Sequence, residues 1–415
     1  MSSKKKLLEN FFSLLFLQGF NFLLPLLTLP YLVRVLGPAN YGVIAFALAF
    51  VQFFVIITDY GFNLTATRQI SINRDNHSKL EEIYNSVLNS KLLIMVISFV
   101  GYFLIVTLVP RFSKDVELFL WAYGMVVGNV LFPVWFFQGM EKMKFISILN
   151  VISKLVFASG IFIFVQGKSD LILVPILQSI GFIVAGVIAL FVIRLKFGVK
   201  YRLSSIESIR YQLKDGLDVF LSTVAISLYT ISNTFILGLF TNNTIVGYYA
   251  SAEKLINAAT GLITPVSQTV YPHLNKLVIE SKERALQFLK KMLYGISLVT
   301  GLVSIIIFFF SNHIVDIVLG PNYGESVVIL KILAFLPLII GLSNVFGVQT
   351  LLTFGFKKVF SRILIIASTL SVVLALILVP NFEVIGTAIG FVVTELFVTI
   401  CMGCYLYNKK INLWR

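Results

Sequence analysis

The chain has 415 residues, of which 58% are hydrophobic and only 13% are charged, and it carries a net charge of +14. A soluble globular protein is roughly 45–50% apolar and about 25% charged, so the composition excludes a soluble fold and makes the lipid bilayer the main solvent. The basic residues lie in gaps between apolar stretches rather than in one continuous basic domain, which excludes a nucleic-acid-binding protein.

Twelve apolar stretches follow one another along the chain, each about as long as the roughly 20 residues that cross a bilayer as a helix. Their apolar runs are continuous, as at Leu92–Leu108, and lack the alternation of membrane-barrel strands. We therefore expect an all-α integral membrane protein. The predicted spans are 11–33, 42–62, 88–109, 118–138, 145–166, 171–194, 217–240, 247–270, 289–310, 325–353, 361–380 and 385–407.

The Lys and Arg residues between the predicted spans lie almost entirely on one side of the membrane. Only Arg34, Arg111, Lys114 and Lys168 fall on the other side, and Lys91, just inside the third span, is counted with the loop before it. Because cytoplasmic loops carry the excess of basic residues, we expect a multi-pass protein of the bacterial inner membrane with both termini in the cytoplasm. Three lysines precede the first stretch and no small-residue cleavage site follows it, so we interpret it as a retained span.

A polar segment near the midpoint, residues 195–216, divides the spans into two sets of six. We expect an N-terminal six-helix bundle at 1–205 and a C-terminal six-helix bundle at 206–415. A weak internal repeat supports this division, because LGPANYG at 36–42 and IVGYY at 245–249 each place Tyr and Gly at the outer mouth of a helix. Six spans in each half predict parallel repeats, related by an axis along the membrane normal.

Polar and ionisable side chains recur on single helical faces of several predicted spans. Such groups are costly in hydrocarbon and should face protein or water. Two interpretations stay open: a hydrated central cleft between the bundles, and hydrogen bonds between packed helices. The residues concerned are Asn21, Gln52, Asp59, Asp218, Asn233, Glu253, Lys254, Asn257 and Glu395.

Two charge pairs have alternative interpretations at this stage. Glu253 and Lys254 could neutralise each other without binding a ligand. Asp59 lies toward the cytoplasmic end of its span and Arg68 lies beyond it, so that the two form either a structural salt bridge or a gate pair.

Two lysines and two prolines mark the ends and bends of predicted spans. Lys154 and Lys331 are close enough to helix ends to extend their ammonium groups to the interface. Pro25 and Pro265 lie on or beside polar stripes. Because proline removes a helix hydrogen bond and bends the axis, we expect these two to act as hinges.

The sequence contains no P-loop, no metal-ligand cluster and no Ser/His/Asp constellation. We therefore expect a protein that is not an enzyme and that holds no cofactor or metal. Cys401 and Cys404 form a lone C-x-x-C pair inside the last span, without a second pair to complete a metal site. We expect them to be packed and unreactive.

Four segments carry a family resemblance: PYLVRVLGPANYGVIAFA (30–47), DYGFNLTATRQIS (59–71), WFFQGMEKMKFISILNVISK (135–154) and SNTFILGLFTNNTIVGYYASAEKL (232–255). With them the chain resembles the Wzx-type polysaccharide biosynthesis flippases, which move O-antigen repeat units. They belong to the multidrug/oligosaccharidyl-lipid/polysaccharide exporter superfamily. The resemblance covers nearly the whole chain. It implies two six-helix bundles on either side of a central cleft, a MATE-like fold, with alternating access between inward- and outward-open states.

The resemblance also implies a substrate and roles for the polar residues. The substrate would be an undecaprenyl-diphosphate-linked oligosaccharide, moved from the cytoplasmic to the periplasmic leaflet. Coupling to an H⁺ or Na⁺ gradient and partnership with a polysaccharide polymerase and a chain-length regulator are further expectations. Cations would offset the diphosphate charge, amides would bind sugar hydroxyls, and buried carboxylates would hold the coupling ion. The cations are Arg34, Lys154, Lys254 and Lys331, the amides are Asn21, Gln52, Asn233 and Asn257, and the carboxylates are Asp59, Asp218, Glu253 and Glu395, with Arg68 as a gating residue.

Three alternatives remain on the sequence alone. A cation-coupled multidrug exporter of the same superfamily would favour an acidic cavity, whereas residues of both signs occur here. A lipid II-type or teichoic-acid-type flippase differs only in the head group. A membrane-embedded polysaccharide polymerase would need a large outer loop or interfacial carboxylates, and the outer loops here are short.

Overall fold

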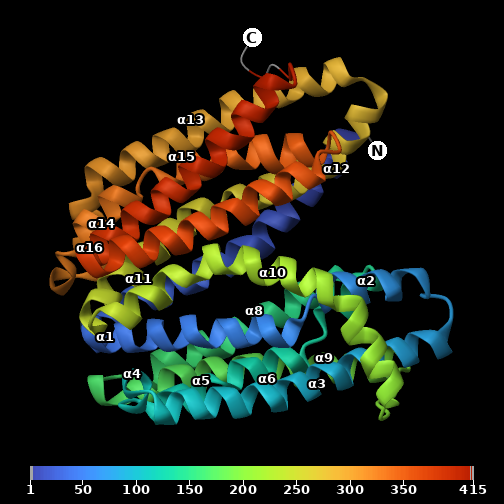
Figure 1. The fold of residues 1–415 in the computed structure, drawn as a ribbon, viewed down its shortest axis with the longest axis horizontal. Coiled ribbons are helices and arrows are strands. Elements are labelled where there is room, and N and C mark those ends of the chain that lie inside the picture. Colours follow the sequence, from blue (N-terminus) through green and yellow to red (C-terminus); the bar gives the residue numbers. More distant parts are fainter. Residues whose placement is uncertain (1–2, 412, 414–415) are drawn as a thin grey trace. The chain divides into compact units, whose positions relative to one another are not determined.

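The computed structural model describes the backbone of residues 3–411 and 413, and their side chains except those of residues 3–23, 25, 222, 225, 226 and 228–230. Every regular element among these residues is helical, as Figure 1 shows. Residue contacts group the chain into two compact units: unit 1 is Met1–Gly42 with Ser232–Arg415, and unit 2 is Val43–Ile231. The bundle boundary expected between residues 205 and 206 stays a prediction.

Unit 2 contains the second part of α1 (Ser3–Asp59) and the first part of α10 (Ile206–Phe240). Its other helices are α2 (Phe62–Ile72), α3 (His77–Leu108), α4 (Pro110–Ser113), α5 (Val116–Ala122), α6 (Gly124–Leu131), α7 (Val134–Gly139), α8 (Met143–Phe164), η1 (Lys168–Ile172) and α9 (Leu173–Phe197). Its core forms around Trp135, Phe136 and Phe137, all fully buried.

Unit 1 contains the remaining parts of α1 and α10 and a set of helices from the second half of the chain. These are α11 (Asn243–Gly261), α12 (Ile263–Glu280), α13 (Lys282–Ile314), η2 (Val315–Leu319), η3 (Pro321–Tyr323), α14 (Ser326–Leu333), α15 (Leu336–Asn344), η4 (Val345–Leu352) and α16 (Lys357–Asn408). Its core includes Leu289, Leu351 and Leu406, none of which is exposed.

Several of the predicted spans are joined or interrupted in the structure. The chain bends within α1 at Gly37 (φ 74°, ψ 171°) and within α16 at Glu383 (φ 47°, ψ −122°), so each of these long helices accounts for two predicted spans. The span predicted at 118–138 is three short helices, α5 to α7. Its last break falls at Pro133, which has no amide hydrogen to continue the helix ladder.

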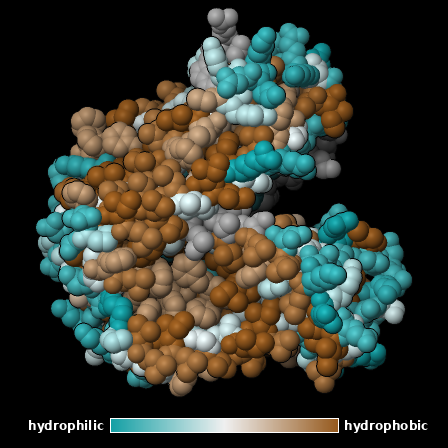
Figure 2. Space-filling view, in the orientation of Figure 1, coloured by the Kyte–Doolittle hydropathy of each residue, from teal (hydrophilic) through white to brown (hydrophobic). Residues whose placement is uncertain are grey.

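Eight helical segments among the described residues are long and apolar enough to cross a membrane. Only 17% of the most apolar stretch of α3, and of α13, is buried within the protein. The apolar surface therefore faces outward, as it does in a bilayer and not in water. Figure 2 shows this surface along the helices of each unit, with hydrophilic side chains gathered at the helix ends. The chain is a multi-pass membrane protein.

The segments predicted at 217–240 and 247–270 are helical in α10 to α12. Within α10, the described stretch Ile231–Phe240 is a shorter apolar helix. Polar residues such as Glu253, Lys254 and Asn257 lower the hydropathy of α11, and such residues are costly against lipid unless they face protein or water.

Helices α1 and α11 cross with their backbones in direct contact within unit 1. A methyl group at Gly42 would lie 1.7 Å from the carbonyl oxygen of Asn243, and one at Gly247 would lie 2.0 Å from the carbonyl oxygen of Pro38. Each glycine thus meets the carbonyl four residues before the other. This reciprocity is typical of a two-fold contact, and it brings together the two segments, 36–42 and 245–249, in which the sequence repeat was found.

Candidate functional site

A half-buried carboxylate lies at the centre of a polar cluster in unit 1. Glu253 of α11 accepts a hydrogen bond from the Thr234 hydroxyl (2.9 Å, Oε2) and another from the Tyr249 hydroxyl (3.3 Å, Oε1). Asn233 lies beside Tyr249 and is 4% exposed, and its side-chain Nδ2 has no hydrogen-bond partner among the described atoms. Tyr41 is buried close enough to interact with the Glu253 charge. The cluster therefore holds one acid among hydroxyl groups that can donate or accept.

The neighbouring face of α11 is exposed. Lys254 follows Glu253 directly, and Asn257 lies almost one helical turn further along, so the two side chains share a face. Glu253 and Lys254 are near enough to interact electrostatically. None of the ion pairs between described residues joins them, however, so the Lys254 ammonium is not held in a close salt bridge with Glu253.

A second buried charge lies in unit 2. The Lys91 ammonium, on α3, is 2.7 Å from Asp59 Oδ1 and 3.4 Å from the Asn129 carbonyl oxygen Oδ1. Lys91 is only 1% exposed, whereas the Asp59 side chain is 21% exposed. Asn63 completes the cluster by donating to Asp59 Oδ2 at 3.4 Å.

The local sequence explains where Asp59 lies. It is the last residue of α1, and the chain turns into α2 through left-handed conformations at Tyr60 (φ 46°) and Gly61 (φ 78°). Tyr60 is held in this turn by stacking on Phe220, with ring centroids 4.6 Å apart. The packed turn fixes the carboxylate opposite α3.

The prediction that Asp59 pairs with Arg68 is wrong. Arg68 is exposed on α2, and Asp59 pairs with Lys91 instead. Lys91 was counted as a loop cation because it follows a polar segment, although it lies within the predicted span 88–109. A lysine inside an apolar stretch was the signal that could have identified the pair.

A ladder of amide side chains holds the segment between α9 and α10 against α3. Asn85 accepts from the Arg202 amide (2.8 Å) and donates to the Lys200 carbonyl (3.0 Å). Asn89 donates to the Arg202 carbonyl (2.9 Å) and accepts from the Tyr201 hydroxyl (2.7 Å). Four residues of a helix rise about 6 Å, and two residues of an extended chain span about 6.6 Å. Asn85 and Asn89, four residues apart on α3, are therefore spaced like peptide groups two residues apart in the extended segment. We call residues 198–205 the strap.

The remaining predicted site residues are distributed over both units. Arg34 donates to the carbonyl of Ile317 in η2, which places it against the end of a helix. Pro265 is buried in α12, Glu395 is 6% exposed in α16, and Lys331 is half-buried on α14. In unit 2, Gln52 and Lys154 are half-buried and Asp218 is exposed. The side chains of Asn21 and Pro25 lie outside the described residues. The binding, gating and hinge roles of these residues stay predictions.

Comparison with known proteins identifies the family and the relatives that this chain resembles. Residues 7–278 match the family model described as "Polysaccharide biosynthesis protein". A protein of Escherichia coli (strain K12) named "Putative O-antigen transporter" is 38% identical over 411 residues, 99% of each chain. A protein of Shigella dysenteriae with the same name is 29% identical over 95% of this chain and 98% of its own.

Two solved structures share the fold. An inward-facing multidrug resistance MATE family transporter of the MOP superfamily gives a TM-score of 0.72 at 16% identity, over 94% of each chain. The lipid II flippase MurJ in an inward closed conformation gives 0.74 at 16% identity, over 96% of this chain and 87% of its own. The predicted all-α, MATE-like fold class is thereby confirmed.

Proposed function

Because the chain belongs to the polysaccharide biosynthesis protein family, we propose that it is a flippase for undecaprenyl-diphosphate-linked oligosaccharide repeat units of the O-antigen type. It moves them from the cytoplasmic to the periplasmic leaflet of the bacterial inner membrane by alternating access, with both termini in the cytoplasm. The full-length similarity to a relative named as an O-antigen transporter supports this proposal, and so does the fold shared with a lipid II flippase.

The observation that carries the proposal is the two-sided polarity of α11. One side of this helix holds the half-buried Glu253 among hydroxyl groups, and the adjacent side exposes Lys254 and Asn257. An exposed ammonium and an exposed amide are costly against hydrocarbon, so they belong to a hydrated surface. A hydrated surface inside the membrane is what a diphosphate and its sugars require while the polyprenyl tail remains in lipid.

In this mechanism the lysines neutralise the diphosphate and the amides bind the sugars. Lys254 offers its ammonium to the phosphate oxygens, because it is exposed and not closely paired. Asn257 and Asn233 supply donors and acceptors for sugar hydroxyls. The unpartnered Nδ2 of Asn233 is costly while it is buried without a partner, and a substrate hydroxyl or water would satisfy it.

We assign coupling to the carboxylates of the predicted spans, with Glu253 as the foremost candidate. Its two hydroxyl neighbours donate to the ionised form, and each hydroxyl can rotate to accept from the protonated form. The cluster can therefore exchange a proton without leaving a polar group unsatisfied. Asp59, Asp218 and Glu395 are further candidates, and coupling by Na⁺ would use the same oxygens. A polymerase and a chain-length regulator would be the partners that act on the flipped product.

The test is transport by the purified chain in liposomes that contain a labelled undecaprenyl-diphosphate-linked oligosaccharide. Translocation is read as loss of access of an added glycosidase to the sugar. Losing a hydrogen bond to a charged group costs about 1.5–3 kcal/mol, so Lys254→Ala should slow translocation by about tenfold or more.

The matched control is Lys276→Ala, which removes an exposed lysine paired with Glu280 on α12. It should transport at the normal rate. Normal transport by Lys254→Ala would remove Lys254 from the mechanism, and no transport by the unaltered chain would reject the proposed function. Polymerisation of the sugar in the same liposomes, or drug resistance in a susceptible host, would indicate one of the alternative functions.

A further inference from the structure

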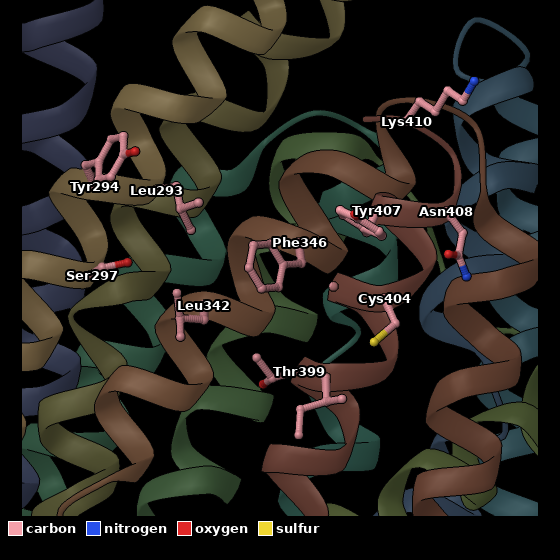
Figure 3. A pocket seen from close by; sticks show the side chains of 12 residues that line it. Leu293, Tyr294, Ser297, Leu342, Phe346, Thr399, Cys404, Tyr407, Asn408 and Lys410 are labelled. Atoms are coloured by element: carbon pink, nitrogen blue, oxygen red, sulfur yellow. The ribbon is translucent and has the colours of Figure 1, made fainter. Parts of the chain in front are cut away.

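A groove in unit 1 lies between α13, α15 with η4, and α16, with a volume of about 1290 Å³. Figure 3 shows Leu293, Tyr294 and Ser297 of α13 facing Cys404 and Tyr407 of α16, with Leu342 and Phe346 between them. The floor is apolar. The groove lies apart from the Glu253 cluster, whose residues do not line it.

The groove opens toward lipid. Tyr294, Ile400 and Tyr407 line it, and they are 58%, 53% and 69% exposed, although all three belong to membrane-crossing segments. Large exposed apolar and aromatic side chains on such helices contact the bilayer. A lipid acyl chain therefore has direct access to the groove.

One end of the groove is rich in positive charge. Lys410 lines it. Lys290 and Lys291 lie one helical turn before Leu293 and Tyr294 on α13, and the nearest acidic residue on that helix, Glu283, lies two turns further away. Basic pockets between membrane helices on the cytoplasmic side are typical binding sites for anionic lipid head groups.

The backbone at Lys410 strengthens this interpretation. Lys410 has φ 55° and follows the end of α16, where its amide donates to Tyr407 and the next amide, of Ile411, donates to Leu406. Glycine is the usual residue in this left-handed capping position. A lysine here costs stability, and its side chain lines the groove.

We propose that this groove binds one anionic diacyl phospholipid of the cytoplasmic leaflet. Its acyl chains lie on Leu293, Leu342 and Phe346, and its phosphate is bound by Lys410 and the neighbouring amide of Asn408. The site goes beyond the proposed transport function and does not depend on it. Lipid binding by the C-terminal helices would then depend on the charge of the lipid head group.

The test uses a thiol that the chain already places in the groove. The sequence has two cysteines. The prediction that both are packed is wrong for Cys404, which is exposed and lines the cavity. In a Cys401→Ala background of the full chain, the rate of maleimide labelling of Cys404 is measured in nanodiscs of phosphatidylcholine, with and without phosphatidylglycerol. Phosphatidylglycerol should slow labelling, and phosphatidylcholine alone should not.

Two variants separate charge from shape. Lys410→Gly removes the ammonium and suits the left-handed backbone, so it should fold well and yet weaken protection by phosphatidylglycerol about fivefold, the effect of one lysine at an anionic surface. Ser297→Phe fills the groove and should abolish protection with the charges intact. The control is Lys409→Gln, because Lys409 lies over the Tyr405 ring at 5.9 Å rather than lining the groove.

Equal protection by both phospholipids would overturn the proposal, since the charge would then play no part. No protection by either phospholipid would also overturn it. Protection by undecaprenyl phosphate but not by phosphatidylglycerol would assign the groove to a polyprenyl tail instead. Failure of transport in the liposome experiment leaves these labelling rates unchanged, so the two proposals fail separately.

Discussion

At the scale of single residues, the Asp59–Lys91 pair should show an asymmetry between its two members. Asp59→Asn leaves a fully buried ammonium without its partner, and breaking a buried pair in this way costs about 3–5 kcal/mol. Lys91→Met leaves a carboxylate that is 21% exposed and still accepts from Asn63, so it should cost less. SDS-induced unfolding of the purified variants measures both costs.

The double variant Asp59→Leu with Lys91→Met is the control for this prediction. Replacing a buried pair by apolar residues of similar size is often neutral, so the double variant should be more stable than Asp59→Asn alone. A larger cost for Lys91→Met than for Asp59→Asn would contradict the burial difference described here.

The surface pair Arg74–Glu141 gives a prediction of pH dependence. The hydrogen bond from the Arg74 guanidinium, at 2.7 Å, holds the pKa of the Glu141 carboxyl below its ordinary value. A lowered folded-state pKa contributes stability above the ordinary Glu pKa of about 4.3, and that contribution is lost as the pH falls through the lower folded-state value. Glu141→Gln should therefore lose less thermal stability than the unaltered protein between neutral pH and about pH 3.

The control for the pH measurement is Glu283→Gln, because Glu283 is exposed and forms no ion pair with a described residue. Its stability should fall with pH as in the unaltered protein. An identical fall for Glu141→Gln would mean that the pair with Arg74 contributes nothing in solution.

The sequence identified the buried acids more readily than their partners. Glu253 and Asp59 were predicted as functional because a carboxylate inside an apolar span is costly. The donors to Glu253, Thr234 and Tyr249, could not be assigned, since hydroxyls are common in membrane helices as simple packing contacts. Which of them reaches the acid depends on helix rotation, which a sequence pattern leaves open.

At the scale of the elements, the crossing of α1 and α11 predicts that Gly247→Ala is strongly destabilising. The added methyl would lie 2.0 Å from the Pro38 carbonyl oxygen, and a backbone atom cannot turn aside as a flexible side chain can. Overpacking costs about 1–3 kcal/mol and occasionally more, and thermal denaturation in detergent should show a loss of at least that size.

Gly101→Ala on α3 is the matched control. A methyl at Gly101 would have nothing within 4 Å, and alanine favours a helix over glycine by about 1 kcal/mol. It should be neutral or stabilising. If Gly247→Ala behaved in the same way, the close approach of the two backbones would be wrong.

The strap predicts a local effect of Asn85→Ala. This change removes the partners of the Lys200 carbonyl and the Arg202 amide, at about 1–3 kcal/mol for a buried group left unsatisfied. Residues 198–205 should then open more often, so that trypsin cleaves the purified protein after Lys200 or Arg202 about tenfold faster. Asn381→Ala removes an exposed asparagine that bonds only within its own helix, and it should leave cleavage at the strap unchanged.

Some features of the helices could be predicted from the sequence and others could not. Helical spans were predictable because backbone groups in lipid must be satisfied internally. The division of one span into α5, α6 and α7 was not predictable. Pro133 was visible in the sequence, but many membrane helices bend at a proline without ending there. The amide ladder of the strap was missed because asparagines four apart on a helix also occur as simple packing residues.

At the scale of the whole molecule, the distribution of basic residues predicts the orientation in the membrane. Both termini should be cytoplasmic, since positive charge is retained on that side. A fluorescent protein fused to either end should fluoresce in cells, and alkaline phosphatase fused to either end should be inactive. Active phosphatase at either terminus would reverse the orientation on which the cytoplasmic assignment of the lipid groove depends.

The family and the fold class were predictable from sequence because both depend on features spread over the whole chain. Composition required a bilayer, continuous apolar runs required helices, and four segments carried the resemblance to a transporter family. The polar residues of the candidate site were named from the sequence, and their roles stay predictions. The groove with Lys410 was not predicted, because its lining residues lie far apart in sequence.

The reciprocal glycine contact also bears on how such a chain could arise. Each partner supplies both the bare backbone and the carbonyl that the other requires, so two copies of one ancestral segment could meet in this way without further change. A chain produced by duplication and fusion of a half-length gene would already contain this helix crossing. Later divergence could then alter almost every neighbouring side chain, provided that both positions remained glycine.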